Sequence, residues 1–339
     1  MAVPEELRKV TMAHAQGAMA LQLAFIGVTN GLLEALVDQP ASPPELAERR
    51  KLDPGYVLRW CEAAYGFGYL DVREGRFTLT DLGRAFLPGE PDTLMPFAVG
   101  SVLGAHMSER AAGLMRTGEQ PGESALAERA TILPWFGPML EATFGSMFER
   151  EVLPGVPAFG EVGVRGGIVL DLGCGNGWYL RRLAARFPAL RGIGLDGFEE
   201  NVRQASERAT RDGLGDRLTF ATGDIYEHAP LEPVALVAMN RALHHVWDQR
   251  EKVFRLLRDA LAPGGVAVIW EPAWPSELSQ LRDPRARAMA VQNLSEHVQG
   301  NHFLRPAEIE AAFAEVGMPA KTFLFGGGLE AVVVAKRVA

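Results

Sequence analysis

The sequence predicts an α/β protein, with a doubly wound, mostly parallel sheet in its second half and a mostly helical first half. From Gly166 onward, apolar strand-like segments alternate with helix-like segments, which implies right-handed crossovers between parallel strands. Before about residue 160, strand signals are few. The last two strand-like segments, about 321–325 and 331–336, flank three glycines (326–328), which predicts a hairpin and an antiparallel final strand.

The first half shows the order helix, helix, hairpin. Ser42-Pro-Pro-Glu45 begins a short helix with an N-cap serine. Asp53-Pro54 caps a second helix that continues to about Gly66, and residues 69–80 form a hairpin around a glycine turn. This order is typical of a winged helix-turn-helix. Further helices rich in Met, Phe and Trp are expected over residues 91–155.

Composition and charge exclude several classes of protein. The chain has 339 residues, 47% of them hydrophobic, enough for two domains with their own cores. Cys61 and Cys174 are the two cysteines, far apart and without partners at metal-ligand spacing, so neither a disulfide framework nor a metal site is expected. A formal net charge of −8 disfavours a nucleic-acid or anionic-membrane partner.

The first thirty residues indicate where the protein works and how it assembles. Glu5 and Glu6 come early, and no short apolar core with a cleavage site follows, so we expect no signal peptide and a cytoplasmic location. The apolar run from Ala18 to Val28 is too short to span a bilayer. It suits a subunit interface instead, which predicts a homodimer.

The most informative segment is Asp171-Leu-Gly-Cys-Gly-Asn-Gly177. A strand from about Ile168 to Leu172 includes this carboxylate, and glycines follow at alternate positions just before a helix-like segment. Glycine lets backbone turn tightly and approach a ligand closely. A strand, a glycine turn and a helix N-terminus at the carboxyl edge of a parallel sheet predict a nucleotide-type cradle. Asp196 ends the next apolar strand, where a carboxylate binds a ribose diol.

The spacing of this segment argues against a dinucleotide. The dinucleotide fingerprint G-x-G-x-x-G differs from the pattern here, and a carboxylate just before the glycines would repel a pyrophosphate. There is no G-K-[ST] sequence for a phosphate-binding Walker loop. The better fit is a nucleoside ligand with a cationic tail.

Residues 160–339 resemble class I S-adenosylmethionine-dependent methyltransferases. The first half, with the Leu-His-x-x-x-Asp stretch, resembles small-molecule O-methyltransferases that carry an N-terminal winged-helix dimerisation domain. The resemblance implies a Rossmann-like seven-stranded sheet with an antiparallel last strand. Five motifs occur in the family's order: 171–177, 194–197, 221–225, 237–245 and 261–269. The domains implied are 1–100 (winged-helix dimerisation), 101–160 (a helical linker contributing to the acceptor pocket) and 161–339 (cofactor binding).

The resemblance also implies S-adenosyl-L-methionine as the cofactor. Asp196 would accept both ribose hydroxyls, Asp224 would accept from the adenine amino group beside Ile225, and Asn240 would reach the methionyl amine. The glycine segment would cradle the methionine moiety and the nucleoside. The implied cofactor-binding residues are Asp171, Gly173, Gly175, Gly177, Asp196, Gly197, Asp224, Ile225 and Asn240.

Chemistry is expected where the fourth strand ends. A hydroxyl acceptor must lose a proton during methyl transfer, and His is the side chain suited to take it near neutral pH. His244 stands where the resembled O-methyltransferases have their general base. The family's next residue is Asp, but here it is His245, which leaves both imidazoles as candidates and a packing role as the alternative. Glu271, at the end of the fifth strand, is the candidate carboxylate that orients the base.

The acceptor pocket is the least defined part of the prediction. Aromatic and Met side chains of about residues 133–148 could line an apolar pocket, although such a stripe is more often plain core. Two histidines before the helix that begins near Arg305 are further candidates, with a surface position as the alternative. The predicted pocket residues are Trp135, Met139, Phe144, Met147, His297 and His302.

The function predicted is methylation of a small-molecule acceptor, with O-methylation of a hydroxylated metabolite or natural product as the specific hypothesis. The alternatives are N- or C-methylation without a base, and a different reaction on the same fold. A DNA-binding regulator is a further alternative. The candidate recognition helix disfavours it, because Arg59 is its one basic residue and stands beside Asp53 and Glu62.

Overall fold

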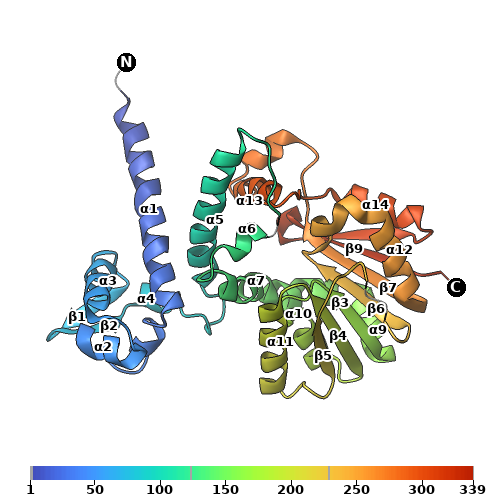
Figure 1. The fold of residues 1–339 in the computed structure, drawn as a ribbon, viewed down its shortest axis with the longest axis horizontal. Helices are drawn as coiled ribbons and strands as arrows, with labels where there is room; N and C mark the ends of the chain where they lie inside the picture. Colours follow the sequence, from blue (N-terminus) through green and yellow to red (C-terminus); the bar gives the residue numbers. More distant parts are fainter. Residues whose placement is uncertain (1–2, 123, 228–229, 339) are drawn as a thin grey trace. The chain divides into compact units, whose positions relative to one another are not determined.

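The computed structural model describes residues 3–122, 124–227 and 230–338. The chain forms two compact units, Met1–Glu109 with Ala127–Thr143, and Arg110–Leu126 with Phe144–Ala339. Figure 1 shows the helices and strands of each unit. No helix among the described residues is long and apolar enough to cross a membrane.

The first unit contains the predicted helices and hairpin. Ser42 caps α2 through a capping box, in which Glu45 Oε2 accepts from the Ser42 backbone N–H at 2.7 Å. Asp53 Oδ1 caps α3 by accepting from the N–H groups of Gly55 and Tyr56. The strands β1 and β2 pair antiparallel. The bounds are α1 Glu5–Thr29, η1 Glu34–Leu36, α2 Pro43–Arg50, α3 Pro54–Gly66, β1 Leu70–Arg73, β2 Arg76–Leu79 and α4 Asp81–Arg84.

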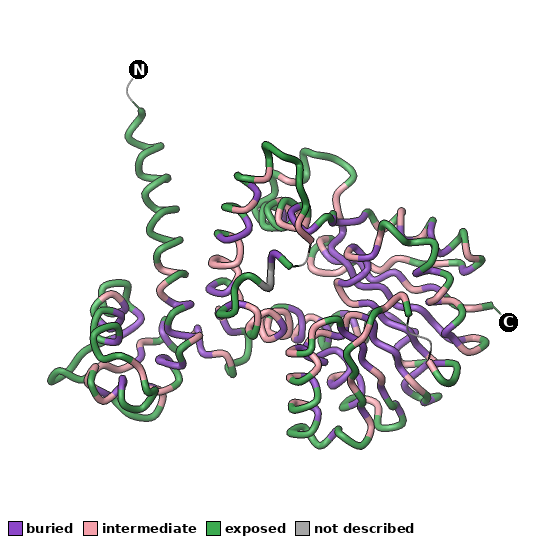
Figure 2. The backbone as a smooth tube through the Cα atoms, in the orientation of Figure 1, coloured by how far each residue is buried: buried purple, intermediate pink, exposed green. Residues whose placement is uncertain are grey.

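The second half of α1 is held against the core of the first unit by hydrogen bonds and apolar packing. Trp60 Nε1 donates to the carbonyl of Leu23 at 3.1 Å, and the Tyr69 hydroxyl donates to the carbonyl of Ala20 at 3.0 Å. Val28 is fully buried in the same core. The first half of α1 has no such cover, and Figure 2 shows it exposed.

Several helices lie between the N-terminal module and the sheet in sequence. The divisions between the two units fall within the first three of them, α5, α6 and α7. The bounds are α5 Met95–Leu114, α6 Ser124–Ala127, α7 Leu133–Met147, η2 Phe148–Val152, α8 Leu153–Gly155 and α9 Pro157–Arg165.

The second unit is built on a seven-stranded sheet of order β5-β4-β3-β6-β7-β9-β8. Strands β3 to β7 pair parallel, and β9 pairs antiparallel with both β7 and β8. This confirms the predicted fold class; the final strand lies inside the sheet, between β7 and β8. The bounds are β3 Gly167–Leu172, β4 Leu190–Asp196, β5 Leu218–Thr222, β6 Val234–Asn240, β7 Leu261–Pro272, β8 Ala320–Phe325 and β9 Glu330–Lys336.

Helices pack on the sheet and complete its core. α10 and α11 contact β4 and β5, while α12 contacts β6 and β7 and α14 contacts β8 and β9. The rings of Phe254 on α12 and Phe313 on α14 meet edge to face at 4.7 Å, both buried. The bounds are α10 Trp178–Arg186, α11 Glu199–Arg211, η3 Leu243–Gln249, α12 Arg250–Ala260, η4 Leu278–Arg282, α13 Arg287–Val298, α14 Pro306–Glu315 and η5 Gly326–Gly328.

The sheet places polar residues at one edge. The carboxyl ends of parallel strands meet on the same side, which is where ligands bind in this architecture. Asp196 ends β4, Asn240 ends β6, and Glu271 is the last residue but one of β7. The candidate site lies along this edge.

Candidate active site

The glycine loop after β3 combines tight packing with one open position. All three glycines have positive φ, namely 76° at Gly173, 53° at Gly175 and 72° at Gly177. A Cβ added at Gly173 would lie 2.5 Å from the Ala242 Cβ, and one at Gly177 would lie 2.7 Å from the Phe220 ring. A Cβ added at Gly175 would have no atom within 4 Å. The backbone at Gly175 therefore faces open space, as a backbone that receives a ligand must.

Asp196 is held rigidly beside this loop. Its Oδ2 accepts from the Gly175 N–H at 2.8 Å, while Oδ1 accepts from the Phe198 N–H at 2.9 Å and from Asn201 Nδ2 at 3.0 Å. The side chain is buried, at 7% exposure. A Cβ added at the next residue, Gly197, would again meet open space. Oδ1 already accepts two hydrogen bonds, whereas Oδ2 accepts one and keeps a lone pair for a further donor, such as a ribose hydroxyl.

Asp171 is a buried carboxylate without a partner. It is 1% exposed, and neither oxygen accepts a hydrogen bond from the described residues. Burial, and then the negative charge of Asp196, raise the pKa of Asp171 to about 8. Asn240 Oδ1 and the Tyr179 hydroxyl are also buried without partners within the described chain. Buried polar groups in proteins are normally hydrogen-bonded, so these atoms indicate a ligand that supplies donors.

The turn after β5 carries the predicted adenine contacts. Asp224 Oδ1 accepts from the Tyr226 N–H at 2.8 Å, which fixes the turn while leaving the carboxylate exposed. Ile225 is partly buried and packs against the core of the second unit. Their roles toward adenine stay predictions.

His244 and Glu271 form a buried pair. His244 lies on η3, the short helix after β6, and its Nδ1 lies 2.7 Å from Glu271 Oε2. Glu271 Oε1 accepts from the backbone N–H groups of Leu243 and His244, at 2.8 and 3.3 Å. Glu271 is fully buried and His244 is 4% exposed. One carboxylate therefore fixes both the loop and the ring orientation.

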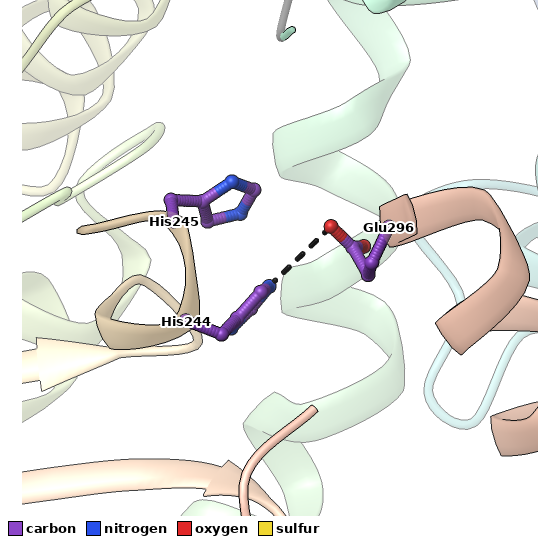
Figure 3. Close-up of side chains that lie close together, drawn as sticks. All are labelled: His244, His245 and Glu296. Carbon is purple, nitrogen blue, oxygen red and sulfur yellow. Dashed lines mark ion pairs between the residues drawn. The ribbon is translucent and has the colours of Figure 1, made fainter. Parts of the chain in front are cut away.

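A second carboxylate faces the other nitrogen of this ring. Glu296, near the end of α13, places Oε2 3.6 Å from His244 Nε2 (Figure 3). Burial lowers the pKa of His244, but the charges and hydrogen bonds of Glu271 and Glu296 outweigh it and raise the pKa to about 10. Burial raises the pKa of Glu296, but its bond and attraction to His244 prevail, so the net shift is downward.

His245 lies against His244. The ring centroids are 4.2 Å apart with an interplanar angle of 36°. His245 Nδ1 lies 2.8 Å from Asn301 Nδ2. Glu296 and Asn301 were not among the residues predicted from the sequence. They stand directly before His297 and His302, which were.

An ion pair stabilises the start of the loop after β6. Arg241 has a positive φ of 57° and binds Glu330 Oε2 at 2.7 Å, with both side chains 10% exposed. Trp270 Nε1 donates to the same oxygen at 2.9 Å. The Arg241 guanidinium lies 4.2 Å from the centroid of the Phe144 ring. These contacts hold the segment between Asn240 and His244 in an otherwise unfavourable backbone conformation.

The predicted acceptor-pocket residues fall in different surroundings. His297 and His302 are exposed, and Gln120 Nε2 donates to the His297 carbonyl at 3.1 Å. Phe144 packs edge to face on Trp270, with centroids 5.8 Å apart. The Met147 methyl group lies near Gly326, at 3.2 Å from where a Cβ would stand. The other two predicted residues, Trp135 and Met139, pack on the core of the first unit.

Comparisons with known proteins agree on the class of protein that this site resembles. Residues 169–265 match the model of a methyltransferase domain. A 3-amino-4-hydroxybenzoate 4-O-methyltransferase of Streptomyces cremeus is 26% identical over 292 residues, which cover 80% of this chain and 75% of the relative. The O-methyltransferase SfmM3 of Streptomyces lavendulae is 29% identical over 241 residues, covering 68% and 70%.

Solved structures show the same fold over the whole length. Human N-acetylserotonin methyltransferase, in complex with SAM, superposes with a TM-score of 0.74 at 17% identity, covering 100% of both chains. The mitomycin 7-O-methyltransferase MmcR superposes with a TM-score of 0.70 at 20% identity, covering 98% of both. At such identities the likeness establishes the fold.

Proposed function

Because the chain is an S-adenosylmethionine-dependent methyltransferase, we propose that it methylates a hydroxyl oxygen of a small molecule, with the His244–Glu271 pair taking the hydroxyl proton. The observation that carries the proposal is the 2.7 Å contact between these two side chains at the carboxyl edge of the sheet. Hydroxylated aromatic acceptors are the first class to test, since the 26% identical relative is named for methylating one.

The glycine loop and its two carboxylates fit the cofactor. S-adenosylmethionine supplies an already activated methyl group, together with an ammonium, a sulfonium and a ribose diol. The unpartnered carboxylate of Asp171 suits a cationic donor, and Oδ2 of Asp196 is fixed where it can accept from a ribose hydroxyl. Gly175 gives the backbone access that a close ligand needs. Asn240, whose Oδ1 is unpartnered, is a second acceptor for the ammonium.

Because the methyl group of the cofactor is already activated, the main chemical task of the protein is to remove the hydroxyl proton of the acceptor. For this step the ring must be neutral, so the acceptor has to replace Glu296 at Nε2, since the contact with Glu296 is one of the causes that raise the pKa of His244 to about 10. The acceptor oxygen would then form its bond to the methyl carbon, as that carbon leaves the sulfonium and the hydroxyl proton passes to Nε2 of His244. Glu271, on Nδ1, keeps the ring in one tautomer and stabilises the imidazolium that forms. Glu296, on the Nε2 side, lies where the acceptor hydroxyl would have to bind. N- or C-methylation would leave the Glu271 contact without a catalytic purpose.

We also propose that the N-terminal module serves dimerisation. Three of its basic residues are engaged within the module: Arg49 and Arg50 donate to backbone carbonyls, and Arg59 pairs with Glu62 at 2.7 Å. Met12 and Met19 are exposed on α1, one heptad apart. The proposed roles of residues 1–100, 101–160 and 161–339 are dimerisation, acceptor-pocket linker and cofactor binding.

A cytoplasmic location is proposed from the cysteines. Cys61 and Cys174 are both buried and unpaired. Free buried thiols are typical of a reducing compartment.

The test is a methyl-transfer assay with labelled S-adenosylmethionine over phenols, carboxylates and amines. We expect a phenolic or other hydroxylated acceptor to be methylated, and His244→Ala to lower kcat by about 10²- to 10⁴-fold, the usual contribution of a general base. Calorimetry of cofactor binding to the same variant is the control, because His244 lies outside the glycine loop. Unchanged kcat in His244→Ala at saturating acceptor would refute the base role.

A further inference from the structure

Three side chains at the centre of the candidate site have the composition of a metal site. His244, His245 and Glu296 each offer one ligand atom, and these atoms lie within 4.8 Å of one another (Figure 3). We propose that these three residues bind one divalent transition-metal ion of the zinc type, with a coordination position left over for the acceptor oxygen. The inference goes beyond the proposed function, which requires no metal.

His244 is oriented as metal-binding histidines are. Its Nδ1 is bonded to Glu271 Oε2 at 2.7 Å, and its Nε2 points to Glu296 at 3.6 Å. A carboxylate on one imidazole nitrogen and a metal on the other is the usual outer-shell arrangement of such sites. Glu271 is fully buried and tied to the backbone at Leu243, so the ring cannot turn without breaking several contacts.

His245 has a comparable anchor. Its Nδ1 lies 2.8 Å from the side-chain amide of Asn301. The oxygen and nitrogen of such an amide exchange places by a half-turn, so the Asn301 carbonyl can equally accept from an Nδ1–H. In that arrangement Nε2 of His245 is the nitrogen suited to a metal.

The charges around the ring favour a cation. Glu271 and Glu296 bring two negative charges against one imidazole, in surroundings where Glu271 is fully buried and the Glu296 side chain is 17% exposed. Arg241, a positive side chain of the same loop whose charge reaches Glu296, is already paired with Glu330. A divalent ion would balance both carboxylates, whereas one added proton balances only one of them.

The types of the three ligands and the distances between their ligand atoms indicate which kind of ion would bind. Two imidazoles and one carboxylate with an open position is a known catalytic zinc set, while magnesium and calcium prefer oxygen ligands throughout. Ligand atoms around a tetrahedral zinc ion stand ~3.4 Å apart, given bonds of about 2.1 Å. The pair His244–Glu296 already lies at 3.6 Å. The third ligand atom lies within 4.8 Å of the other two, so ion binding would draw the three atoms together by up to ~1.4 Å.

An ion held here would act directly on the acceptor. A hydroxyl bound at the open position of a metal loses its proton more readily than a free one. Metal and proton exclude each other on Nε2 of His244. A metal-loaded enzyme would therefore activate the acceptor through the ion, and the metal-free enzyme through the ring.

The experiment measures metal binding without cofactor or acceptor, so the proposed methyl transfer has no bearing on its outcome. The full-length protein, with any affinity tag removed, is stripped with a chelator and dialysed. Zn²⁺ binding is followed by calorimetry, and Co²⁺ binding by visible absorption, which reports the coordination number. We expect one ion per chain and a four- or five-coordinate Co²⁺ spectrum.

Variants identify the ligands. Loss of an outer-shell partner such as Glu271 weakens metal binding by about 10- to 100-fold. Glu296→Gln and His245→Ala each remove a ligand itself, so each should weaken Zn²⁺ binding by more than that. His302→Ala, which removes an exposed histidine beside Asn301, should leave the affinity unchanged. Thermal unfolding and cofactor binding verify that each variant is folded. Absence of stoichiometric binding, or an affinity that neither Glu296→Gln nor His245→Ala lowers, overturns the proposal.

Discussion

Glu271 contacts His244 through both oxygens of its carboxylate. Oε2 of Glu271 lies 2.7 Å from the His244 ring nitrogen Nδ1, and Oε1 accepts from the backbone N–H of the same residue at 3.3 Å. His244 follows β6, and Glu271 lies near the end of the neighbouring strand β7; the pairing of the two strands ends at Asn240 and Trp270. The sheet therefore sets the position of the ring, and the carboxylate sets its orientation.

The first prediction concerns Glu271→Gln. The amide keeps the size of the side chain but cannot stabilise an imidazolium as a carboxylate does. We expect kcat to fall by about 10²-fold, within the range that general acid–base groups contribute, with little change in cofactor affinity. Steady-state kinetics and calorimetry measure the two. Because Glu271 is fully buried, the unfolding temperature is measured alongside. A loss of cofactor binding as large as the loss of kcat would show that the loop has collapsed and that the orienting role is wrong.

The second prediction concerns the pH dependence of cofactor binding. The pKa of Asp171 is raised to about 8, mainly by burial, so below that pH the free enzyme carries a protonated carboxyl. An ammonium ligand favours the ionised form. Binding must then release a proton, and affinity should rise as the pH increases toward 8, by up to about tenfold per pH unit. In Asp171→Asn the affinity should be weaker at pH 8 and lack this slope. Calorimetry of cofactor binding from pH 6 to 9 tests this prediction. An equal dependence of affinity on pH in the wild type and in the variant would show that Asp171 does not bind the ammonium.

The same group makes a stability prediction for the cofactor-free protein. Its pKa in the unfolded chain is near the ordinary aspartate value of 3.8, and burial raises it to about 8 in the folded chain. Between these values the folded state binds more protons than the unfolded state, so stability falls as the pH rises from about 4 to 8. Asp171→Asn should remove that contribution and unfold at a higher temperature than the wild type at pH 8. A lower unfolding temperature for the variant at that pH would rule out the buried, unpartnered carboxylate.

These two predictions use residues that the sequence indicates well. The segment from Asp171 to Gly177 is local, and positive φ at three alternate positions is a requirement that glycine meets at low cost. The β strands and the capped helices were predicted for the same reason, since their signals lie within a few residues of one another. The capping box at Ser42 and Glu45 is an example.

The residues that the sequence did not indicate are brought to the site by long-range folding. Glu296 lies on α13, about fifty residues beyond His244, in a helix without a marked apolar face. Nothing in its neighbourhood distinguishes it from a surface glutamate. Residue type alone favoured His297 and His302 in this segment, yet both are exposed, and their neighbours Glu296 and Asn301 reach the histidine pair.

The third prediction separates the roles of two glycines. Gly173→Ala would bring a Cβ to 2.5 Å from Ala242, against a buried loop, and should destabilise the protein by about 1–3 kcal/mol beyond the backbone strain. Gly175→Ala meets no protein atom within 4 Å, so only its positive φ of 53° opposes it, at about 1–2 kcal/mol. Gly175→Ala should therefore lose more cofactor affinity per unit of lost stability. Chemical denaturation measures the stability that each variant loses, and calorimetry measures the cofactor affinity that it loses. A larger ratio of lost affinity to lost stability in Gly173→Ala than in Gly175→Ala would contradict the open position at Gly175.

The last prediction concerns the exposed stripe of α1. Met12, Met19 and Ile26 are 62%, 56% and 45% exposed and recur every seven residues, so they share one face of the helix. Burying such a stripe against a second chain is favourable, and a lysine there is not. Met12→Lys with Met19→Lys should convert the proposed dimer to a monomer without loosening the fold, because the contacts of α1 with the core of its unit begin at Ala20, after both methionines. Sedimentation and thermal unfolding are measured together, with Lys9→Glu, an exposed change on the same helix, as the control. A wild-type protein that sediments as a monomer at high concentration would refute dimerisation, and a dimer that survives both lysines would place its interface elsewhere.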